Sequence, residues 1–314
     1  MNGRIVIGIG AVTAAALAVA AGIIEAAGQN LQQPQPPYLS NDIQKVRVIA
    51  SFFPLYDFAK NVGGDRAEVS VMVPAGIEPH NWEPTPRDIA DAENADMIVY
   101  NGAGFERWVS DINAKFVVDT SIGIQLMQGA GEGIQEESGL DPHIWLDPVL
   151  AKQQVEAIRD GFVQIDPVNS GYYHQNAQRY IAELDSLDSF IRSNLSNCEL
   201  RDFIAFHNAF SYFANRYNLT QHSIQGISPE GDVLPQRIQE IKDLAATLGI
   251  NEIYAEDLID PRLANVIAGE IPNGQVLVLS PIEGLKREEI EQGLGYIDKM
   301  REDVQNLKVG LKCL

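Results

Sequence analysis

Cysteine is scarce in this sequence, because the 314 residues contain only Cys198 and Cys313. Two cysteines are too few for a zinc cluster built from thiolates or for a small scaffold held by many disulfides. No cysteine follows the apolar N-terminal run, so a lipid-modified cysteine is not expected there. Any metal site in this chain therefore has to use histidines and carboxylates.

Basic residues are also few, with 23 Lys and Arg against 43 Asp and Glu and a formal net charge of −20. This balance excludes most nucleic-acid-binding proteins, which need a basic surface to contact phosphates. An acidic surface instead attracts cations. The sequence also contains no HExxH motif and no nucleophile elbow, so we do not expect an enzyme, although a zinc hydrolase would share some of the features described below.

The N-terminal region predicts a location outside the cytoplasm. Residues 5–24 carry no charge, and twenty apolar residues are enough to span a bilayer. We expect residues 1–28 to anchor the protein in the membrane; the alternative is a signal segment cleaved after Ala18-Val19-Ala20, which would release a secreted or periplasmic protein. Residues 29–44 are rich in Gln and Pro and are predicted to form an extended tether. Because such a compartment is oxidising, Cys198 and Cys313 are predicted to form a disulfide.

The remaining chain alternates short β-rich segments with helical segments, which is typical of α/β folds with parallel sheets. The pattern predicts two α/β lobes, residues 45–167 and 198–314, joined by one long rigid helix within residues 168–197. The expected strands are 46–51, 69–73, 97–100, 116–119, 203–206, 223–225, 252–255 and 276–279. The main expected helices are 54–62, 148–163, 170–195, 209–217, 235–248, 261–270 and 286–307, with a further helix opened by the N-cap Thr85 and by Pro86.

Three of the five histidines follow predicted strands or lie at loop edges, where ligands bind in open α/β sheets. His80 and His143 share the local pattern Pro-His-x-Trp, and His207 lies between a strand and a helix. Three imidazoles with one oxygen ligand are a common zinc site. By contrast, His174, inside a predicted helix, and His222 are interpreted as satisfied loop or core residues without a metal.

Four segments of the sequence resemble the zinc/manganese solute-binding proteins of ABC transporters, the cluster A-I family. They are VPAGIEPHNWEPTPRD (73–88), DPHIWLDP (141–148), FHNAFSYF (206–213) and QGISPE (225–230). The resemblance implies two α/β lobes on a rigid linking helix with a metal in the cleft between the lobes. It also implies that His80, His143 and His207 are ligands, and that a histidine at the third position is associated with zinc rather than manganese.

The chain departs from the family pattern at the fourth ligand. Ser280 aligns with the aspartate that usually completes the site, and a neutral hydroxyl is a poor zinc ligand. Glu283, three residues later, is our first candidate; Glu256 at the end of another strand is a weaker one, and water is a further alternative. The loop 129–139 contains several acids but no histidine, and we interpret it as a solvated loop.

The sequence therefore predicts an extracytoplasmic protein that captures Zn²⁺ and delivers it to an ABC permease. Binding of Mn²⁺ or Fe²⁺ by a member of the same family, and a surface adhesin or interaction protein on this fold, remain the alternatives. We expect a monomer.

Overall fold

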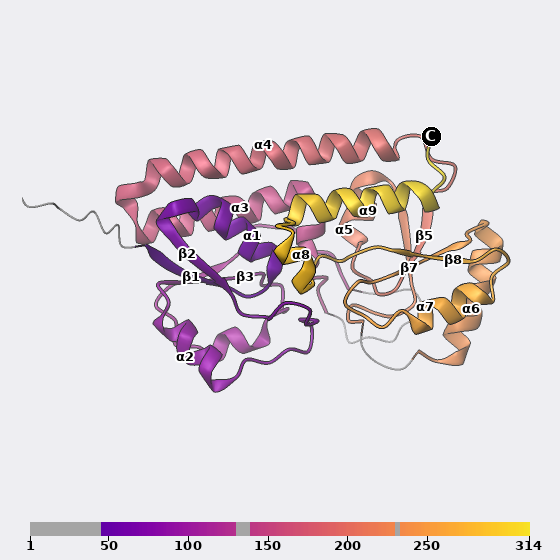
Figure 1. Cartoon of the computed structure of the whole chain (residues 1–314), viewed down its shortest axis with the longest axis horizontal. Helices are drawn as coiled ribbons and strands as arrows, with labels where there is room; N and C mark the ends of the chain where they lie inside the picture. The colour runs from indigo at the N-terminus through magenta and orange to yellow at the C-terminus, as the bar shows by residue number, and fades with distance from the viewer. Residues whose placement is uncertain (1–44, 130–138, 230–232) are drawn as a thin grey trace, which may run out of the picture. The chain divides into compact units, whose positions relative to one another are not determined.

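Two parallel sheets of four strands each organise the part of the chain that the structure describes (Figure 1). The computed structural model describes residues 45–129, 139–229 and 233–314. The predicted anchor and tether and most of the acidic loop lie outside these residues. Among the described residues, no helix is long and apolar enough to cross a membrane.

The first sheet has the strand order β2-β1-β3-β4, and all its strands run in parallel. Its strands are β1 (Val46–Ala50), β2 (Ala67–Val71), β3 (Met97–Tyr100) and β4 (Val117–Asp119). Helix α1 (Phe53–Gly63) connects the first two strands, and α2 (Pro86–Asn94) precedes β3. As predicted, Thr85 caps α2: its Oγ1 accepts from Asp88 N, while Asp88 Oδ2 accepts from Thr85 N. This reciprocal cap fixes the end of the loop that carries His80.

The second sheet repeats the same order as β6-β5-β7-β8. Its strands are β5 (Asp202–Ala205), β6 (Thr220–Ser223), β7 (Glu252–Ala255) and β8 (Gln275–Val278). The helices between them are α5 (Ser211–Tyr217), α6 (Pro235–Leu248) and α7 (Arg262–Gly269). In both sheets the first strand lies between the second and the third, so the chain reverses its direction of travel across the sheet there. Ligands bind at the carboxyl ends of strands beside such a point.

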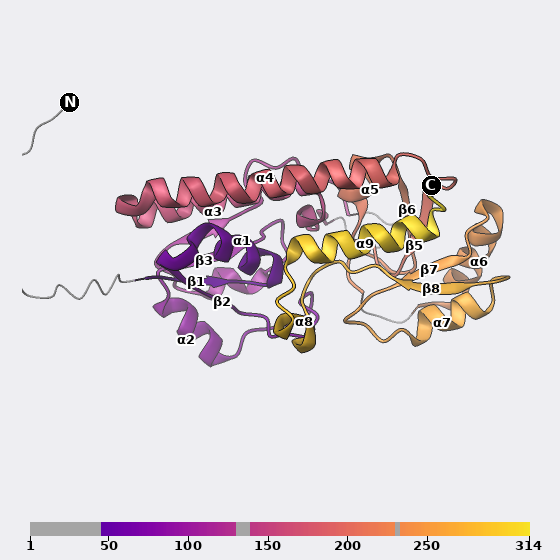
Figure 2. The ribbon, with the colours of Figure 1, turned by 45° about the horizontal axis from the view of Figure 1, so that its top comes forward.

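The 26-residue helix α4 (Ser170–Leu195) links the two halves. It packs against α3 (Pro148–Ile165) and α1, and also against α5 and α9 (Tyr296–Gly310) (Figures 1 and 2). One hydrophobic core runs through these helices and includes Phe58 of α1, Leu187 of α4 and Leu307 of α9. The prediction of two parallel α/β lobes joined by a long helix is confirmed, and α4 has the predicted bounds.

Several predicted boundaries differ from the observed ones, and one predicted helix is wrong. Residues 286–307 form two helices, α8 (Arg287–Glu291) and α9, because Gly293 has a positive φ of 76° and Gly295 is extended at the N-terminus of α9. Strand β6 begins three residues earlier than predicted, since Thr220 pairs with Asp202. Strand β2 ends at Val71, two residues before the predicted end. The backbone N–H groups of Met72 and Val73 still donate to Ala50 O and Ser51 O.

The C-terminus of the chain is tied to the end of α4. Cys198 and Cys313 form a disulfide across a sequence separation of 115 residues. Backbone hydrogen bonds on both sides, Leu200 N to Leu311 O and Leu314 N to Asn197 O, continue the contact. Helix α9 is therefore attached at its end to the segment that enters the second sheet.

Candidate metal site

His80 lies in the loop between β2 and α2. Its backbone N–H donates to Glu78 Oε1 at 3.0 Å, which holds the local turn. The imidazole packs edge-on against Phe105, with ring centroids 4.8 Å apart. Its side chain is 7% exposed. His80 thus has an apolar support on one side of its ring.

His143 lies after β4, at the start of a 3-10 helix, η3 (Ile144–Leu146), that leads into α3. Asp141 Oδ1 accepts from the backbone N–H of His143 at 3.0 Å and lies 2.8 Å from Nδ1. Both side chains are fully buried. The carboxylate therefore orients the ring and leaves Nε2 free to face the centre of the site.

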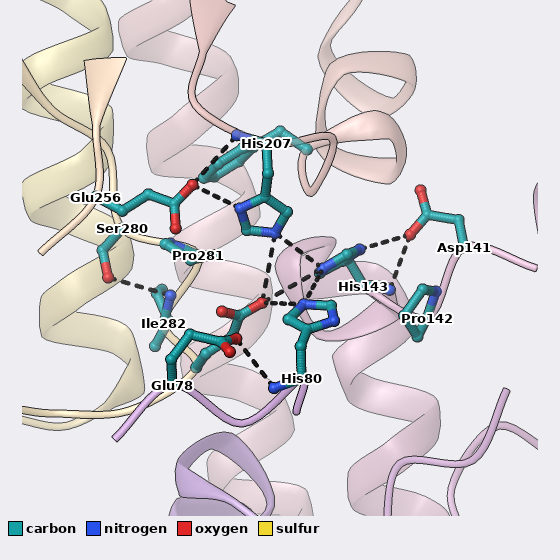
Figure 3. Close-up of polar contacts among 12 residues, drawn as sticks. Glu78, His80, Asp141, Pro142, His143, His207, Glu256, Ser280, Pro281 and Ile282 are labelled. Atoms are coloured by element: carbon teal, nitrogen blue, oxygen red, sulfur yellow. Dashed lines mark hydrogen bonds and ion pairs between the residues drawn. The ribbon is translucent and has the colours of Figure 1, made fainter. Parts of the chain in front are cut away.

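His207 lies after β5 and is held in the same way by a carboxylate from another strand. Glu256, directly after β7, places Oε1 2.5 Å from His207 Nδ1 and accepts from the His207 backbone N–H at 3.2 Å. Figure 3 shows the Glu256 and Asp141 carboxylates behind their two histidines, on the side away from the centre. Two of the three imidazoles thus present Nε2 inward because an acid fixes Nδ1.

The three inward nitrogens meet one carboxylate oxygen. The distance from His143 Nε2 is 3.3 Å to His80 Nε2 and 3.2 Å to His207 Nε2. Glu283 Oε1 lies 3.1 Å from His80 Nε2, 3.3 Å from His143 Nε2 and 3.6 Å from His207 Nε2. Ligand atoms about 2.0–2.1 Å from a tetrahedral zinc ion are separated by about 3.3 Å. Five of the six distances among the four ligand atoms are thus 3.1–3.6 Å, close to the edge length of such a tetrahedron.

Burial and mutual contacts set the charge of this group. Burial lowers the pKa of His80, although Glu283 opposes the shift. Burial would also lower the pKa values of the other two imidazoles, but their acidic partners outweigh it and raise the pKa of His143 and, strongly, that of His207. Burial alone would raise the pKa of Glu283, yet the three histidines hold it well below its usual range. Glu283 is therefore a buried anion that suits a cation.

Comparison with known proteins gives the family. The family described as "Zinc-uptake complex component A periplasmic" (ZnuA) matches residues 48–310. The chain belongs to the ZnuA family. Its members are solute-binding components of extracytoplasmic uptake systems and not enzymes.

The individual relatives of this ZnuA-family chain include proteins named for zinc uptake or zinc binding. It is 37% identical to the high-affinity zinc uptake system protein ZnuA of Bacillus subtilis, over 85% of this chain and 88% of the relative. The zinc-binding protein AdcA of Streptococcus pyogenes is 33% identical over 84% of this chain, which spans only 56% of AdcA. Among solved structures, the Zn(II)-bound ZnuA-like domain of Streptococcus pneumoniae AdcA matches with a TM-score of 0.75 and 33% identity, over 85% of this chain and 99% of that domain.

The structure brings four of the predicted site residues together and separates two others. His80, His143, His207 and Glu283 offer ligand atoms that all lie within 4.8 Å of one another. Glu256 lies behind His207 rather than among the ligand atoms. Ser280 also lies outside the group, and its hydroxyl contacts Asp257 and Ile282.

Two contacts of the site were not predicted from sequence. Asp141 orients His143, and the only signal was its position two residues before the histidine in Asp-Pro-His. Trp145, in the second Pro-His-x-Trp segment, donates from its Nε1 to Pro281 O at 2.7 Å. This bond joins the segment of His143 to the turn that carries Glu283, and nothing in the local sequence of Trp145 indicates it.

A cavity of about 830 Å³ borders the site on the side of His80. Its wall includes Trp82, Arg107, Trp108 and Leu140, but none of the other three clustered residues. His80 is therefore the member of the group that faces this space.

Glu106 is a further buried acid, at the carboxyl edge of the first sheet. Burial raises the pKa of Glu106 to about 7, while hydrogen bonds from Ser51 Oγ and from the backbone N–H groups of Asn101 and Gly102 oppose the shift. The folded protein thus retains a proton that an ordinary glutamate loses near pH 4.5.

Between about pH 4.5 and 7 the unfolded chain loses this proton before the folded protein does, so the contribution of Glu106 to stability falls as the pH rises. In Glu106→Gln this dependence is absent. We expect the free energy of unfolding of the variant, relative to the parent, to rise by about 3 kcal/mol across this window. Urea denaturation of the metal-free proteins at several pH values measures this difference. A constant difference would contradict the raised pKa.

Proposed function

We propose that this chain captures Zn²⁺ outside the cytoplasm and delivers it to an ABC permease, with His80, His143, His207 and Glu283 as the four ligands. The observation that carries the proposal is the spacing of three Nε2 atoms and one carboxylate oxygen, which in five of their six pairs is 3.1–3.6 Å, close to the distance between two ligand atoms of a tetrahedral zinc ion. The names of the bacterial relatives, a zinc uptake protein and zinc-binding proteins, support the same cargo.

The donor set favours Zn²⁺ over Mn²⁺. Imidazole nitrogens suit zinc, whereas manganese prefers sites rich in oxygen ligands. The four clustered ligand atoms are three nitrogens and one oxygen, which is a nitrogen-rich set. Glu283 compensates one of the two positive charges of the ion, and Glu256 and Asp141 lie directly behind two of the ligands.

An adhesin is not the favoured function, although one structural relative carries that description. The laminin-binding protein Lmb of Streptococcus agalactiae, a bifunctional protein with adhesin and metal transporting activity, is 30% identical, with a TM-score of 0.78 over 85% of this chain and 100% of that one. The zinc uptake protein ZnuA of Bacillus subtilis and the zinc-binding protein AdcA of Streptococcus pyogenes, at 37% and 33% identity, are more similar in sequence. The buried cluster also has a direct explanation in metal capture and none in adhesion.

A metal titration with the purified, metal-free protein tests the proposal. Calorimetry and native mass spectrometry should find one Zn²⁺ per chain, and excess Mn²⁺ should fail to displace it. Glu283→Gln keeps the size of the side chain but removes its charge, so it should weaken zinc binding by about 1–3 kcal/mol. Unchanged affinity in this variant would remove Glu283 from the ligand set, and displacement of zinc by equimolar Mn²⁺ would overturn the assignment of the metal.

The proposed location is the outer surface of the cell membrane, with residues 1–28 as an uncleaved anchor and residues 29–44 as a tether to the folded part. Twenty uncharged residues in the N-terminal sequence support this proposal. Mass spectrometry of the protein isolated from its native membrane should detect peptides that begin before Gln29. A mature N-terminus near Ala21 would instead indicate cleavage and a released protein.

The proposed organisation assigns residues 45–167 and 198–314 to two lobes that act together in a monomer. The site supports this division, because His80 and His143 come from the first part and His207 and Glu283 from the second. A single chain thus supplies all four proposed ligands.

A further inference from the structure

The turn that presents Glu283 contains an unusual backbone conformation. Strand β8 ends at Val278, and Glu283 follows five residues later. Between them, Ile282 has a φ of 57° and is completely buried. A β-branched residue in the left-handed region is a clear conformational outlier. Such a conformation costs about 1–3 kcal/mol and persists only where its surroundings hold it.

Ser280 makes the hydrogen bonds that hold this turn. Its Oγ accepts from the backbone N–H of Ile282 at 3.1 Å and donates to Asp257 Oδ1 at 3.0 Å. Its own backbone N–H donates to Asp303 Oδ1 at 2.8 Å. The Ser280 hydroxyl therefore bonds to a residue within the turn, Ile282, and to a residue outside it, Asp257. Figure 3 shows the bond to Ile282.

Asp257 is in turn fixed by a buried ionic network. Lys299 Nζ of α9 lies 3.1 Å from Asp257 Oδ2 and 2.6 Å from Glu289 Oε1 of α8. The Lys299 and Asp257 side chains are each only 5% exposed. A buried ion pair of this kind is directional and costly to break. The acceptor of the Ser280 hydroxyl is thus held in one place.

The other side of the turn is held from the segment of His143. Trp145 Nε1 donates to Pro281 O at 2.7 Å, and Tyr296 Oη donates to Trp145 O at 2.5 Å. Trp145 is fully buried. The turn is therefore held by Asp257 and Asp303 from its own half of the molecule and by Trp145 from the half that carries His143.

We propose that Ser280 is a positioning residue, whose hydroxyl holds the strained turn so that Glu283 meets the three imidazoles. This inference rests on the proposed role of Glu283 as a zinc ligand. Without the hydroxyl, the buried N–H of Ile282 loses its acceptor and its φ relaxes toward negative values. Because Glu283 is the next residue, that relaxation moves its carboxylate away from the imidazole nitrogens.

A double-mutant cycle between Ser280→Ala and Glu283→Gln tests the proposal. Zinc affinity is measured by competition with a chromogenic chelator. We expect Ser280→Ala to weaken zinc binding at least tenfold in the parent and less than twofold in the Glu283→Gln background. Ser280→Thr, which keeps the hydroxyl, should retain most of the affinity. Ser223→Ala, at the end of β6, is the matched control for loss of a buried serine hydroxyl and should bind zinc like the parent.

Two further readouts separate positioning from general stability. The visible absorption spectrum of the Co²⁺-loaded Ser280→Ala variant should shift toward that of Glu283→Gln, because both change the carboxylate ligand. Hydrogen exchange of the Ile282 amide in the metal-free protein should become at least tenfold faster in Ser280→Ala, while amides of β5 remain unchanged. This second measurement does not depend on metal binding.

An equal loss of affinity in both backgrounds, or parental affinity in Ser280→Ala, would overturn the inference. Tighter zinc binding by Ser280→Asp would also overturn it, because position 280 would then act as a ligand position. A parent protein that binds no zinc would instead overturn the proposed function, while faster exchange at Ile282 in Ser280→Ala would still support the role of the hydroxyl in the turn.

Discussion

Replacing His143 with alanine is expected to weaken zinc binding about 100-fold. Protein zinc sites with four ligands bind with about 10–16 kcal/mol, so one ligand accounts for about 3 kcal/mol, and each 1.4 kcal/mol is a factor of ten. The substitution also leaves the buried Asp141 carboxylate without its imidazole partner. Zinc affinity measured by chelator competition at pH 7.5 gives the result, and His207→Ala should behave similarly.

His222→Ala is the matched control for these variants. His222 is on β6, next to the strand that precedes His207, and its Nε2 lies 2.9 Å from Asp202 Oδ1. It is therefore a histidine paired with an acid but outside the cluster. Its replacement should change zinc affinity less than twofold. If His143→Ala bound zinc as tightly as the parent, His143 would not be a ligand.

Removing the disulfide is expected to lower the free energy of unfolding by about 5 kcal/mol. In the chain-entropy model, a bridge that closes a loop of about 100 residues restricts the unfolded chain by this amount. The bridge between Cys198 and Cys313 spans a separation of 115 residues. Urea denaturation of the Cys198→Ser/Cys313→Ser double variant, compared with the parent under non-reducing conditions, measures the loss.

Two observations serve as controls for the disulfide. Thiol labelling of the unfolded, unreduced parent should detect no free thiol, and two reactive thiols would contradict the bridge. Zinc affinity of the double variant should stay close to that of the parent, because neither cysteine belongs to the cluster of ligand atoms. An unchanged denaturation midpoint would show that the backbone contacts around the bridge suffice to hold the C-terminus.

Local sequence patterns predicted the parts of the fold that depend on local interactions. The bounds of α4 and α6 were correct, because uninterrupted helical patterns and the N-terminal Pro235 define them. The helix predicted over residues 286–307 was wrong, since the apolar spacing continues across Gly293 while the backbone there turns to a positive φ. Edge strand β6 was misplaced because its bounds depend on pairing with β5.

In the candidate site, too, local sequence patterns indicated some residues, whereas the place of others depends on contacts between residues distant in sequence. The Pro-His-x-Trp pattern and the position after β5 indicated three histidines, and the fold brings these three together. Glu283 was only the first of several candidates, because its place depends on the turn after β8 and on contacts from Asp257 and Trp145. Those contacts join residues more than twenty positions apart, and no local pattern encodes them.

The position of Trp145 gives the protein an internal optical reporter. Its indole ring lies 5.1 Å from the imidazole of His143 and also contacts the rings of Phe52 and Phe105, at 4.8 and 5.5 Å. Fluorescence of a buried indole depends on the charge of an adjacent imidazole. The emission of Trp145 will therefore change when a cation binds at His143 Nε2. The other two tryptophans, Trp82 and Trp108, contact each other, with ring centroids 5.8 Å apart. With both replaced by phenylalanine, the remaining emission would follow the arrival and departure of the ion in real time, without any attached dye.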